Sequence, residues 1–493
     1  MKNYKDLIVK VKKFYKNKNF FEAKNLLLKI LNDHTIGNDL KVNLYVLISD
    51  ICYKVNDFTS AEKYLLKSIE GGKSNSEVFN MLGNTYLKQR DYKSSEKYYL
   101  KSIKIDDTDE VALINLAILY HNLGKQKEAI SFYKKVLKKN PQNIGALYNL
   151  SNIENSIVDI KTINKLEKLV FEKNLNNFNL ASCYFLLARE QKKNNNLDEE
   201  LNLLAQANDY SYKTNLKKNN QLNHFWLNSF LKNIHLSKFI KVEKLLINTK
   251  KIYPIFIIGL PRSGSTLIES IISSGHSKIE NLGETNLVNW AFLNTNKDIF
   301  DSSNKKIKIN LNDMSKKLSD SFQNLNIKNY NQKIIFTEKS LENFHYIELL
   351  LNIYPNAKFI HSHRNLIDNI FAIYKQFLPS ISWSHSIENI LLYIDNYLSI
   401  MNYFKKKYSD RIISISLENF TSDPKNLSKA IYKFCDLKWS DKCLDFHKRS
   451  DLFINTASNN QIRNNINQYD ESKYQPYKEI LKDYFAKYHW LNY

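Results

Sequence analysis

A short segment after an apolar run carries the residue types that bind an oxyanion. Ile255–Leu260 is expected to form a buried strand, and a helical pattern opens at Leu267. The end of this strand and the loop after it carry two glycines, one arginine and three hydroxyl side chains, at Gly259, Arg262, Ser263, Gly264, Ser265 and Thr266. Such a strand–loop–helix turns backbone N–H groups and a helix N-terminus toward one point, and glycines allow close backbone approach. The loop therefore suits a phosphate or sulfate group.

The loop differs from a nucleoside-triphosphate-binding loop at one informative position. The lysine that such loops carry after their second glycine is replaced by Ser265, and a cation stands inside the loop at Arg262. This replacement argues against ATP or GTP hydrolysis and favours a different phosphate-containing donor. Two alternatives stay open: a nucleotide kinase of related fold, and a tight strand–helix turn that binds nothing.

With these residues, the loop resembles the phosphosulfate-binding loop of sulfotransferases, which use 3′-phosphoadenosine-5′-phosphosulfate (PAPS) as donor. The resemblance implies that the loop residues Arg262, Ser263, Gly264, Ser265 and Thr266 hold the 5′-phosphosulfate. Catalysis of such a transfer depends mainly on positioning and electrostatics, by analogy with phosphoryl transfer. Side chains would supply the cations, so the resemblance implies PAPS as a co-substrate and no metal.

Two further segments resemble the catalytic elements of this family. Asn281-Leu-Gly-Glu-Thr285 is similar to the Gly-Glu element of the protein-tyrosine and tetratricopeptide-linked sulfotransferases, which implies that Glu284 is the base for an acceptor hydroxyl. A helix-capping role for Glu284 is the alternative. Phe336-Thr-Glu-Lys-Ser-Leu-Glu-Asn-Phe344 resembles Asp-Lys-x-Pro-x-Asn-Phe, which implies that Lys339 stabilises charge on the leaving phosphate.

The remaining expected donor contacts come from two later segments. Arg364 follows an apolar strand, as does the family's arginine for the donor 3′-phosphate, and a guanidinium can grip a phosphate with two hydrogen bonds. Residues 455–463 resemble the family's late loop over the nucleotide, which implies contacts from Ser458 and Arg463. The chain departs from the family pattern at Ala372, where a serine is usual, and at Leu417, where a tyrosine is usual.

The N-terminal part of the chain repeats with a period of 34 residues. Small and large apolar residues recur in register in two units, Leu82-Gly83, Tyr86, Ser95, Tyr99 and then Leu116-Ala117, Tyr120, Ala129, Tyr133. This pattern resembles tetratricopeptide repeats, in which small residues let paired helices cross closely. We expect these repeats over residues 1–160, and further helical hairpins and a connector over 161–250, with a polar loop at Lys217–Gln221.

A different pattern begins near residue 251, where apolar strands alternate with helices. The strands are expected at Ile255–Leu260, Lys333–Thr337, Lys358–Ser362 and Arg411–Ser416. This alternation indicates a mainly parallel sheet, whose ligands bind outside the carboxyl ends of the strands. The expected fold is thus an α-helical tetratricopeptide-like array followed by an α/β P-loop-like sulfotransferase domain over residues 251–493.

Composition limits the classes of binding partner and the cellular compartment that we expect for this protein. The formal net charge is +22, but the chain is rich in Lys, Asn, Ile and Tyr, which looks like the bias of an AT-rich genome, so we expect no nucleic-acid partner. The four cysteines show no metal-ligand or disulfide spacing, and buried free thiols in a reducing compartment are expected. No apolar run is long enough to span a membrane, which favours the cytoplasm.

These observations favour a cytoplasmic sulfotransferase that transfers a sulfuryl group from PAPS to an acceptor hydroxyl. A protein or peptide bound by the repeats is one acceptor class, and glycans or small alcohols stay open. The alternative is a non-catalytic repeat scaffold with a degenerate, nucleotide-binding sulfotransferase domain, which the departures at Ala372 and Leu417 would suit.

Overall fold

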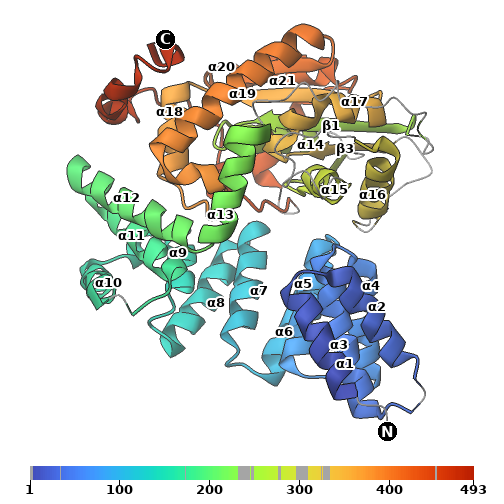
Figure 1. Cartoon of the computed structure of the whole chain (residues 1–493). Coiled ribbons are helices and arrows are strands. Elements are labelled where there is room, and N and C mark those ends of the chain that lie inside the picture. Colours follow the sequence, from blue (N-terminus) through green and yellow to red (C-terminus); the bar gives the residue numbers. More distant parts are fainter. Residues whose placement is uncertain are drawn as a thin grey trace. The chain divides into compact units, whose positions relative to one another are not determined.

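A computed structural model of the chain describes residues 4–33, 35–172, 174–230, 245, 249–275, 279–295, 309–323, 325, 334–449 and 452–492 (Figure 1). The chain divides into two compact units. The first comprises Met1–His121, Lys125–Gln142 and Lys317–Lys328, and the second comprises Asn122–Gly124, Asn143–Lys316 and Asn329–Tyr493. The domain boundaries expected at residues 160 and 250 stay predictions.

The first unit is built from helical hairpins that recur at the expected interval. Its helices are α1 (Tyr4–Lys16), α2 (Phe20–Leu31), α3 (Asn38–Lys54), α4 (Phe58–Glu70), α5 (Ser76–Lys88), α6 (Tyr92–Ile105), α7 (Glu110–Asn122) and α8 (Gln126–Lys139). The second helices of successive hairpins begin at Phe58, Tyr92 and Gln126, which are spaced as the repeat period predicts. The tetratricopeptide-like array is therefore confirmed for these hairpins.

Local sequence explains how each hairpin turns and closes. Asn56 and Arg90 occupy equivalent turns with positive φ values of 61° and 65°. The next residue in each turn, Asp57 or Asp91, caps the following helix by accepting a backbone N–H bond at 3.1 Å or 3.0 Å. Within the α5–α6 hairpin, a Cβ on Gly83 would lie 2.4 Å from the Tyr99 ring, so the two helices can cross this closely only at a glycine.

The second unit begins with more helical hairpins. They are α9 (Ile144–Ser151), α10 (Ile160–Glu172), α11 (Asn177–Lys193), α12 (Leu197–Lys213) and α13 (Leu216–Asn223), followed by a π-helical turn η2 (His224–Phe230). The hairpin expected around residues 194–196 is confirmed as α11–α12. The loop expected at Lys217–Gln221 is wrong, because this stretch lies in α13, where the buried Asn219 donates from Nδ2 to the Tyr212 carbonyl at 2.8 Å.

A five-stranded, all-parallel sheet forms the centre of the second unit. Its strands are β1 (Ile252–Gly259), β2 (Ile279–Asn281), β3 (Ile334–Glu338), β4 (Lys358–His363) and β5 (Ile412–Ser416), in the order β2-β3-β1-β4-β5. The four expected strands are confirmed within a few residues at each end, except that Lys333, the expected first residue of one of them, lies outside the described residues. The short β2 was not expected, because three residues carry too little pattern to be recognised.

Helices and 3₁₀ turns connect these strands. They are α14 (Ser265–Ser274), α15 (Leu287–Thr295), α16 (Leu311–Gln323), η6 (Leu341–Tyr346), α17 (Ile347–Ile353), α18 (Leu366–Tyr374), η7 (Ser382–His385) and α19 (Ile387–Lys407). After β5 follow α20 (Leu417–Ser422), α21 (Pro424–Phe434), η8 (Asp441–Lys448), α22 (Asn459–Ile462), η9 (Gln475–Tyr484) and η10 (His489–Asn492). The expected α/β class is thus confirmed for this part of the chain.

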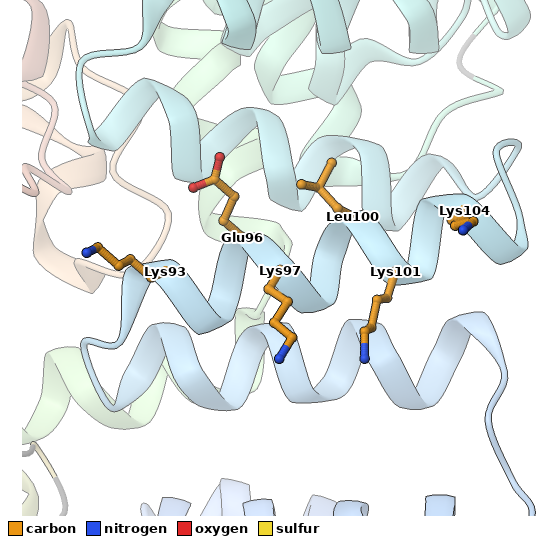
Figure 2. A pocket seen from close by; sticks show the side chains of 6 residues that line it. All are labelled: Lys93, Glu96, Lys97, Leu100, Lys101 and Lys104. Atoms are coloured by element: carbon orange, nitrogen blue, oxygen red, sulfur yellow. The ribbon is translucent and has the colours of Figure 1, made fainter.

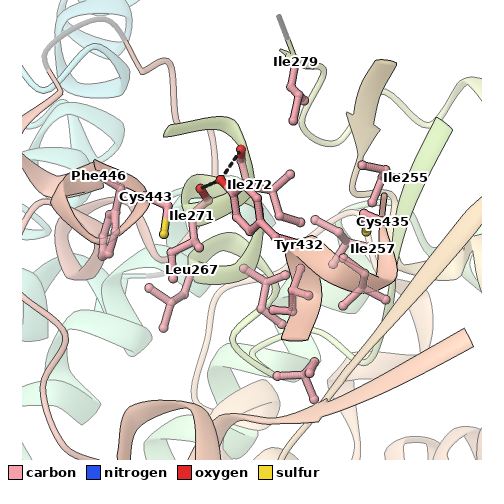
Figure 3. Close-up of a cluster of buried hydrophobic side chains, with 14 of the residues drawn as sticks. Ile255, Ile257, Leu267, Ile271, Ile272, Ile279, Tyr432, Cys435, Cys443 and Phe446 are labelled. Carbon is pink, nitrogen blue, oxygen red and sulfur yellow. Dashed lines mark hydrogen bonds between the residues drawn. The ribbon is translucent and has the colours of Figure 1, made fainter. Parts of the chain in front are cut away.

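The core beside β1 holds α14 against α21 and η8 (Figure 3). Tyr432 lies at its centre, and its hydroxyl donates toward the Ile271 and Ile272 carbonyls, each at 2.9 Å. All four cysteines are free and buried, and Cys435 and Cys443 pack in this cluster. The cluster fixes α14, and with it the loop that precedes this helix.

No helix within the described ranges is long and apolar enough to cross a membrane.

The α11–α12 hairpin packs on the sheet-containing part of the same unit. Asn208 of α12 donates from Nδ2 to the Tyr374 carbonyl of α18 at 3.0 Å. Beyond α18, the Phe377 ring lies 5.0 Å from Phe178 and 5.3 Å from Phe185, both in α11. Aromatic pairs at such distances pack favourably. The hairpin is therefore joined to the segment that follows α18.

Candidate functional site

The loop between β1 and α14 holds an unusual backbone conformation. Gly259 has φ of 148°, and a Cβ there would lie 2.2 Å from the Ser362 carbonyl oxygen of β4, so no other residue fits. Gly264, at the N-cap of α14, has φ of 91°, and Arg262 has φ of 68°. A left-handed arginine is uncommon, and its backbone strain must be offset by neighbouring contacts.

Those contacts come from β4 and α18. Ser263 and Ser362 exchange hydrogen bonds, with 3.2 Å between their hydroxyls and 2.8 Å from Ser362 Oγ to the Ser263 carbonyl. Asn369 of α18 donates from Nδ2 to the Pro261 carbonyl at 2.7 Å. The loop is therefore fixed from two sides, with the first turn of α14 directly behind it.

The late segment 452–463 meets this loop. Arg262 donates from Nη1 to Ser458 Oγ at 2.5 Å and from Nη2 to Gln461 Oε1 at 3.3 Å. One turn further along, the hydroxyls of Thr266 and Thr456 lie 3.3 Å apart. The structure thus brings together Arg262, Thr266 and Ser458, which the sequence assigned to one ligand, and adds Gln461 and Thr456.

Arg364 lies just beyond the carboxyl end of β4, and 9% of its side chain is exposed. It donates from Nη1 to the Arg262 carbonyl at 3.2 Å, and from Nη2 and Nε to the Tyr469 hydroxyl at 2.7 Å and 3.2 Å. The Tyr469 hydroxyl in turn bonds the carboxylate of Asp368, and the Tyr474 ring lies 5.5 Å from the guanidinium. Sequence reasoning missed Tyr469, because nothing in its local sequence marks it.

Three cations, Arg262, Arg364 and Lys473, lie near one another, although Arg364 is also paired with Asp368 at 3.6 Å. Burial lowers the pKa of Lys473, and the charges of Lys192, Arg262 and Arg364 lower it further. Burial likewise lowers the pKa of Arg262, and the charge of Arg364 lowers it further, whereas the charges of Tyr474 and Glu284 oppose the shift. Mutual repulsion of this kind is relieved when an anion binds between the cations. The electrostatics therefore suit an anionic ligand.

Arg463, another expected ligand contact, binds backbone carbonyls of its own segment and of the end of α7. Its guanidinium donates to the carbonyls of Leu452, Asn122 and Arg449 at 2.7, 2.8 and 3.2 Å. These bonds give Arg463 a structural role in shaping the late segment, whereas Ser458 of the same segment contacts the loop arginine. A ligand contact from Arg463 stays a prediction.

The turn that carries Glu284 is clamped on both sides by buried carboxylates. Glu269 of α14 accepts from the Gly283 backbone N–H at 3.1 Å and from the Thr337 hydroxyl at 3.2 Å. Glu338 accepts from the Thr285 hydroxyl at 2.7 Å and from its backbone N–H at 3.3 Å. Since the residues before and after it are both held, Glu284 has a fixed position beside the end of β3.

Glu284 pairs with Lys339, so the two expected catalytic residues meet. Glu284 Oε1 accepts a hydrogen bond from Lys339 Nζ, and the side chains are 43% and 1% exposed, respectively. Burial alone would lower the pKa of Lys339, but the charges of Glu284 and Glu269 outweigh it and raise the pKa above its ordinary value. The lysine is therefore a permanent cation, while the carboxylate keeps access to solvent.

Two more carboxyl groups near Glu284 have perturbed proton affinities. Burial raises the pKa of Glu269 to about 7, against the opposing charge of Lys339. Burial, with the charge of Glu284, raises the pKa of the half-buried Glu342 to about 7. Neither residue was predicted from the sequence. Glu269 is a single charged residue in an otherwise uncharged helix, and Glu342 occupies a position of its motif where any residue is allowed.

Two of the departures from the family pattern, Ala372 and Leu417, are buried differently. Ala372 is buried in α18, whereas Leu417 covers the loop, since its Cδ1 would lie 2.7 Å from a Cβ placed on Gly264.

The histidines of β4 are internal: His361 bonds the hydroxyls of Ser414, at 3.1 Å, and Tyr397. Across the described ranges, no group of three or more histidine, cysteine, aspartate or glutamate residues could hold a metal ion.

Family models match both parts of the chain. A model described as "Sulfotransferase family" matches residues 254–441, and tetratricopeptide-repeat models match residues 76–109 and 111–143. A curated protein from Aquifex aeolicus (strain VF5), described as uncharacterized, is 27% identical over 252 residues. That match covers 48% of this chain and only 33% of the relative's length.

Solved structures of low sequence identity also match. The sulfotransferase domain of the Synechococcus PCC 7002 olefin synthase is 14% identical with a TM-score of 0.31, over 48% of this chain and 91% of that domain. The sulfotransferase STF9 from Mycobacterium avium is 12% identical with a TM-score of 0.29, over 66% and 96%. The C-terminal part of a TPR repeat-containing protein from Cytophaga hutchinsonii is 16% identical with a TM-score of 0.32, over 46% and 89%. On these family-model matches, residues 254–441 are similar to the sulfotransferase family, and residues 76–109 and 111–143 are similar to tetratricopeptide repeats.

Proposed function

We propose that the C-terminal domain transfers a sulfuryl group from PAPS to an acceptor hydroxyl. One observation carries the proposal: the loop 260–264, Lys339 and Arg364 directly follow the carboxyl ends of three adjacent parallel strands, β1, β3 and β4. Ligands of open parallel sheets bind at this edge. The groups gathered there comprise an anion-binding loop, two guanidinium groups and one carboxylate–lysine pair.

The donor would lie across this edge. Arg262 and the loop N–H groups, with Ser263, Gly264, Ser265 and Thr266, would hold the 5′-phosphosulfate, and Arg364 with Ser458 would hold the 3′-phosphate. The positive charge shared by Arg262, Arg364 and Lys473 supports this orientation, because two separated anionic groups would relieve it. Tyr469, now bonded to Arg364, would share that guanidinium with the 3′-phosphate.

The transfer would proceed by in-line displacement at sulfur. The acceptor oxygen forms a bond to sulfur, the bond between sulfur and the bridging oxygen of the 5′-phosphate breaks, and adenosine 3′,5′-bisphosphate leaves with the bonding electrons. Glu284 takes the hydroxyl proton, and Lys339 together with the loop N–H groups stabilises the negative charge on the departing phosphate. No metal is needed for this balance of charge.

The ion pair gives a reason for the order of events. Without substrates, Glu284 and Lys339 neutralise each other. A donor phosphate beside Lys339 would compete for the ammonium group and free the carboxylate to accept a proton. The base would therefore become active only when the donor is in place, which limits wasteful proton abstraction.

The acceptor and the compartment are also part of the proposal. We expect a hydroxyl on a protein or peptide, because tetratricopeptide-like arrays offer extended binding surfaces, while glycans and small alcohols are tested beside it. Four free cysteines suit a reducing compartment such as the cytoplasm.

The alternative is a scaffold that binds the nucleotide without turnover. The burial of Ala372, where a hydroxyl would otherwise stand, is the observation that favours it. Calorimetry with adenosine 3′,5′-bisphosphate and with ATP tests the donor site, and selective binding of the bisphosphate is expected. Labelled PAPS with cell extract then tests turnover: binding without any labelled product would favour the scaffold, and preference for ATP would contradict both.

A further inference from the structure

Helix α6 of the repeats displays four exposed lysines, Lys93, Lys97, Lys101 and Lys104. Three of them are spaced four residues apart and so lie along one side of the helix. None of the four forms an ion pair with a carboxylate in the part of the chain that the structure describes. Like charges at this spacing repel each other.

The one carboxylate on α6 is already engaged. Glu96 accepts from the Tyr120 hydroxyl at 2.8 Å and pairs with Lys125 at 3.3 Å. Figure 2 shows Glu96 and Leu100 directed to one side of α6, and Lys97 and Lys101 to the other. Glu96 therefore serves the contact with α7 and the turn after it and leaves the lysine charges uncompensated.

Aromatic rings hold two of the lysine heads in place. Lys101 Nζ lies 5.2 Å from the Tyr98 ring centroid and 5.6 Å from that of Phe79, and Lys97 Nζ lies 5.5 Å from Tyr98. Cation–π contacts of this kind position an ammonium group without neutralising it. The lysines thus form an ordered row of positive charge.

The row borders a shallow hollow with apolar side chains. The four lysines, Glu96 and Leu100 line a hollow of about 470 Å³. The Leu100 side chain is 43% exposed, and Ile105 at the end of the helix is 52% exposed. A surface of this composition offers an apolar contact beside a row of positive charges.

A lysine excess is not confined to α6, because α8, at the equivalent place in the next hairpin, carries five lysines and one glutamate. Helix α4, at the equivalent place in the preceding hairpin, carries Lys63 and Lys67 together with Glu62 and Glu70, and so has no net charge. Helix α6 carries four lysines and one glutamate. What distinguishes α6 is therefore not its charge alone but the hollow beside Leu100 and the ammonium groups of Lys97 and Lys101 held over aromatic rings.

We propose that this face of α6, defined by Lys93, Lys97, Leu100, Lys101 and Lys104, docks an acidic polypeptide segment that carries an apolar side chain. The partner's carboxylates would pair with the lysine row, and its apolar residue would cover Leu100. Nucleic acid fits less well, because α6 has no arginine and presents an aliphatic side chain beside the lysine row. The proposal concerns docking alone and does not depend on sulfuryl transfer.

The test uses the full chain and fluorescence anisotropy at two salt concentrations. The probe is a fluorescein-labelled peptide of glutamate and serine with one central leucine. The double variant K97E/K101E should bind about tenfold more weakly than the unchanged chain, in line with two lost charge pairs and new repulsion. Higher salt should weaken binding to the unchanged chain, because exposed charges are screened.

The matched control is K12E/K16E, which makes the same charge change on two exposed lysines of α1. It should keep the affinity within about twofold, and L100A should weaken binding severalfold without changing the net charge. K97Q/K101Q removes the two positive charges without adding negative ones. Circular dichroism of this variant checks that any loss of binding does not come from misfolding. Equal losses in K12E/K16E, no binding to the unchanged chain, or tighter binding of a single-stranded RNA would overturn the proposal.

Discussion

Lys339 and Glu284 form an ion pair in which the lysine is buried and the carboxylate faces solvent. The two residues come from different segments, and their backbones are joined as well, since the Lys339 N–H donates to the Gly283 carbonyl at 2.9 Å. This connection places the Gly283–Glu284 turn at the end of β3. The ammonium group of Lys339 is buried inside the protein, whereas the carboxylate of Glu284 can reach an incoming acceptor.

The first prediction concerns Glu284→Gln. Turnover should fall by roughly 10²–10⁴, because the amide cannot accept the hydroxyl proton. Affinity for adenosine 3′,5′-bisphosphate should stay within a few-fold, measured by calorimetry. The variant should remain folded although Lys339 loses its partner, since the carboxyl groups of Glu269 and Glu338 still act on the lysine. Transfer from labelled PAPS at the normal rate would show that Glu284 is not the base.

The parts of the site that sequence analysis identified are those with a local pattern. The loop around Arg262 and the strand ends before Lys339 and Arg364 depend on residues adjacent in sequence, so a short pattern identifies them. Tyr469 lies 105 residues beyond Arg364, and its contact depends on the path of the whole C-terminal segment. No local pattern encodes such a path.

The same distinction explains the errors in the fold. The period of 34 residues predicts hairpins, because each repeat buries the same positions. In contrast, the polar stretch Lys217–Gln221 forms a helix although its helix propensity is weak. Contacts such as that of Asn219 with Tyr212 override this weak propensity. Glu269 was missed for a related reason: its role follows from the turn at Gly283, which meets it only in the folded chain.

The second prediction is a pH dependence that originates at Glu269. Its pKa is raised to about 7 in the folded protein, so the folded state holds a proton that the unfolded state loses near its ordinary value of 4.5. The resulting stabilisation is complete below about pH 4.5 and is lost as the pH rises through 7. The contribution is at most about 3 kcal/mol, from the size of the shift.

Glu269→Gln should remove this dependence and still accept the Gly283 hydrogen bond. Between pH 5 and pH 8, the melting temperature of the unchanged chain should therefore fall relative to that of the variant. Scanning calorimetry on both proteins at each pH measures the difference. A constant difference across this range would mean that Glu269 titrates normally.

The third prediction separates the two phosphate positions. Arg364→Ala should weaken binding of adenosine 3′,5′-bisphosphate by about 1.5–3 kcal/mol, the range for a hydrogen bond to a charged group. Adenosine 5′-phosphosulfate lacks the 3′-phosphate, so its binding should change much less. Calorimetric titration of both ligands provides the comparison, and equal losses would place Arg364 away from the 3′-phosphate.

The last prediction tests the packing of the repeats at Gly83. A methyl group there would lie 2.4 Å from the Tyr99 ring, so Gly83→Ala must displace either the buried ring or one of the two helices. Overpacking of this kind costs about 1–3 kcal/mol, and it outweighs the helix preference of about 1 kcal/mol for alanine over glycine. The matched control is Gly37→Ala at the start of α3, where nothing lies within 4 Å of the added Cβ. Chemical denaturation followed by circular dichroism should show the loss for Gly83→Ala and a change within about 1 kcal/mol for the control. If Gly83→Ala were instead more stable than the unchanged chain, the helices would not be in contact at this glycine.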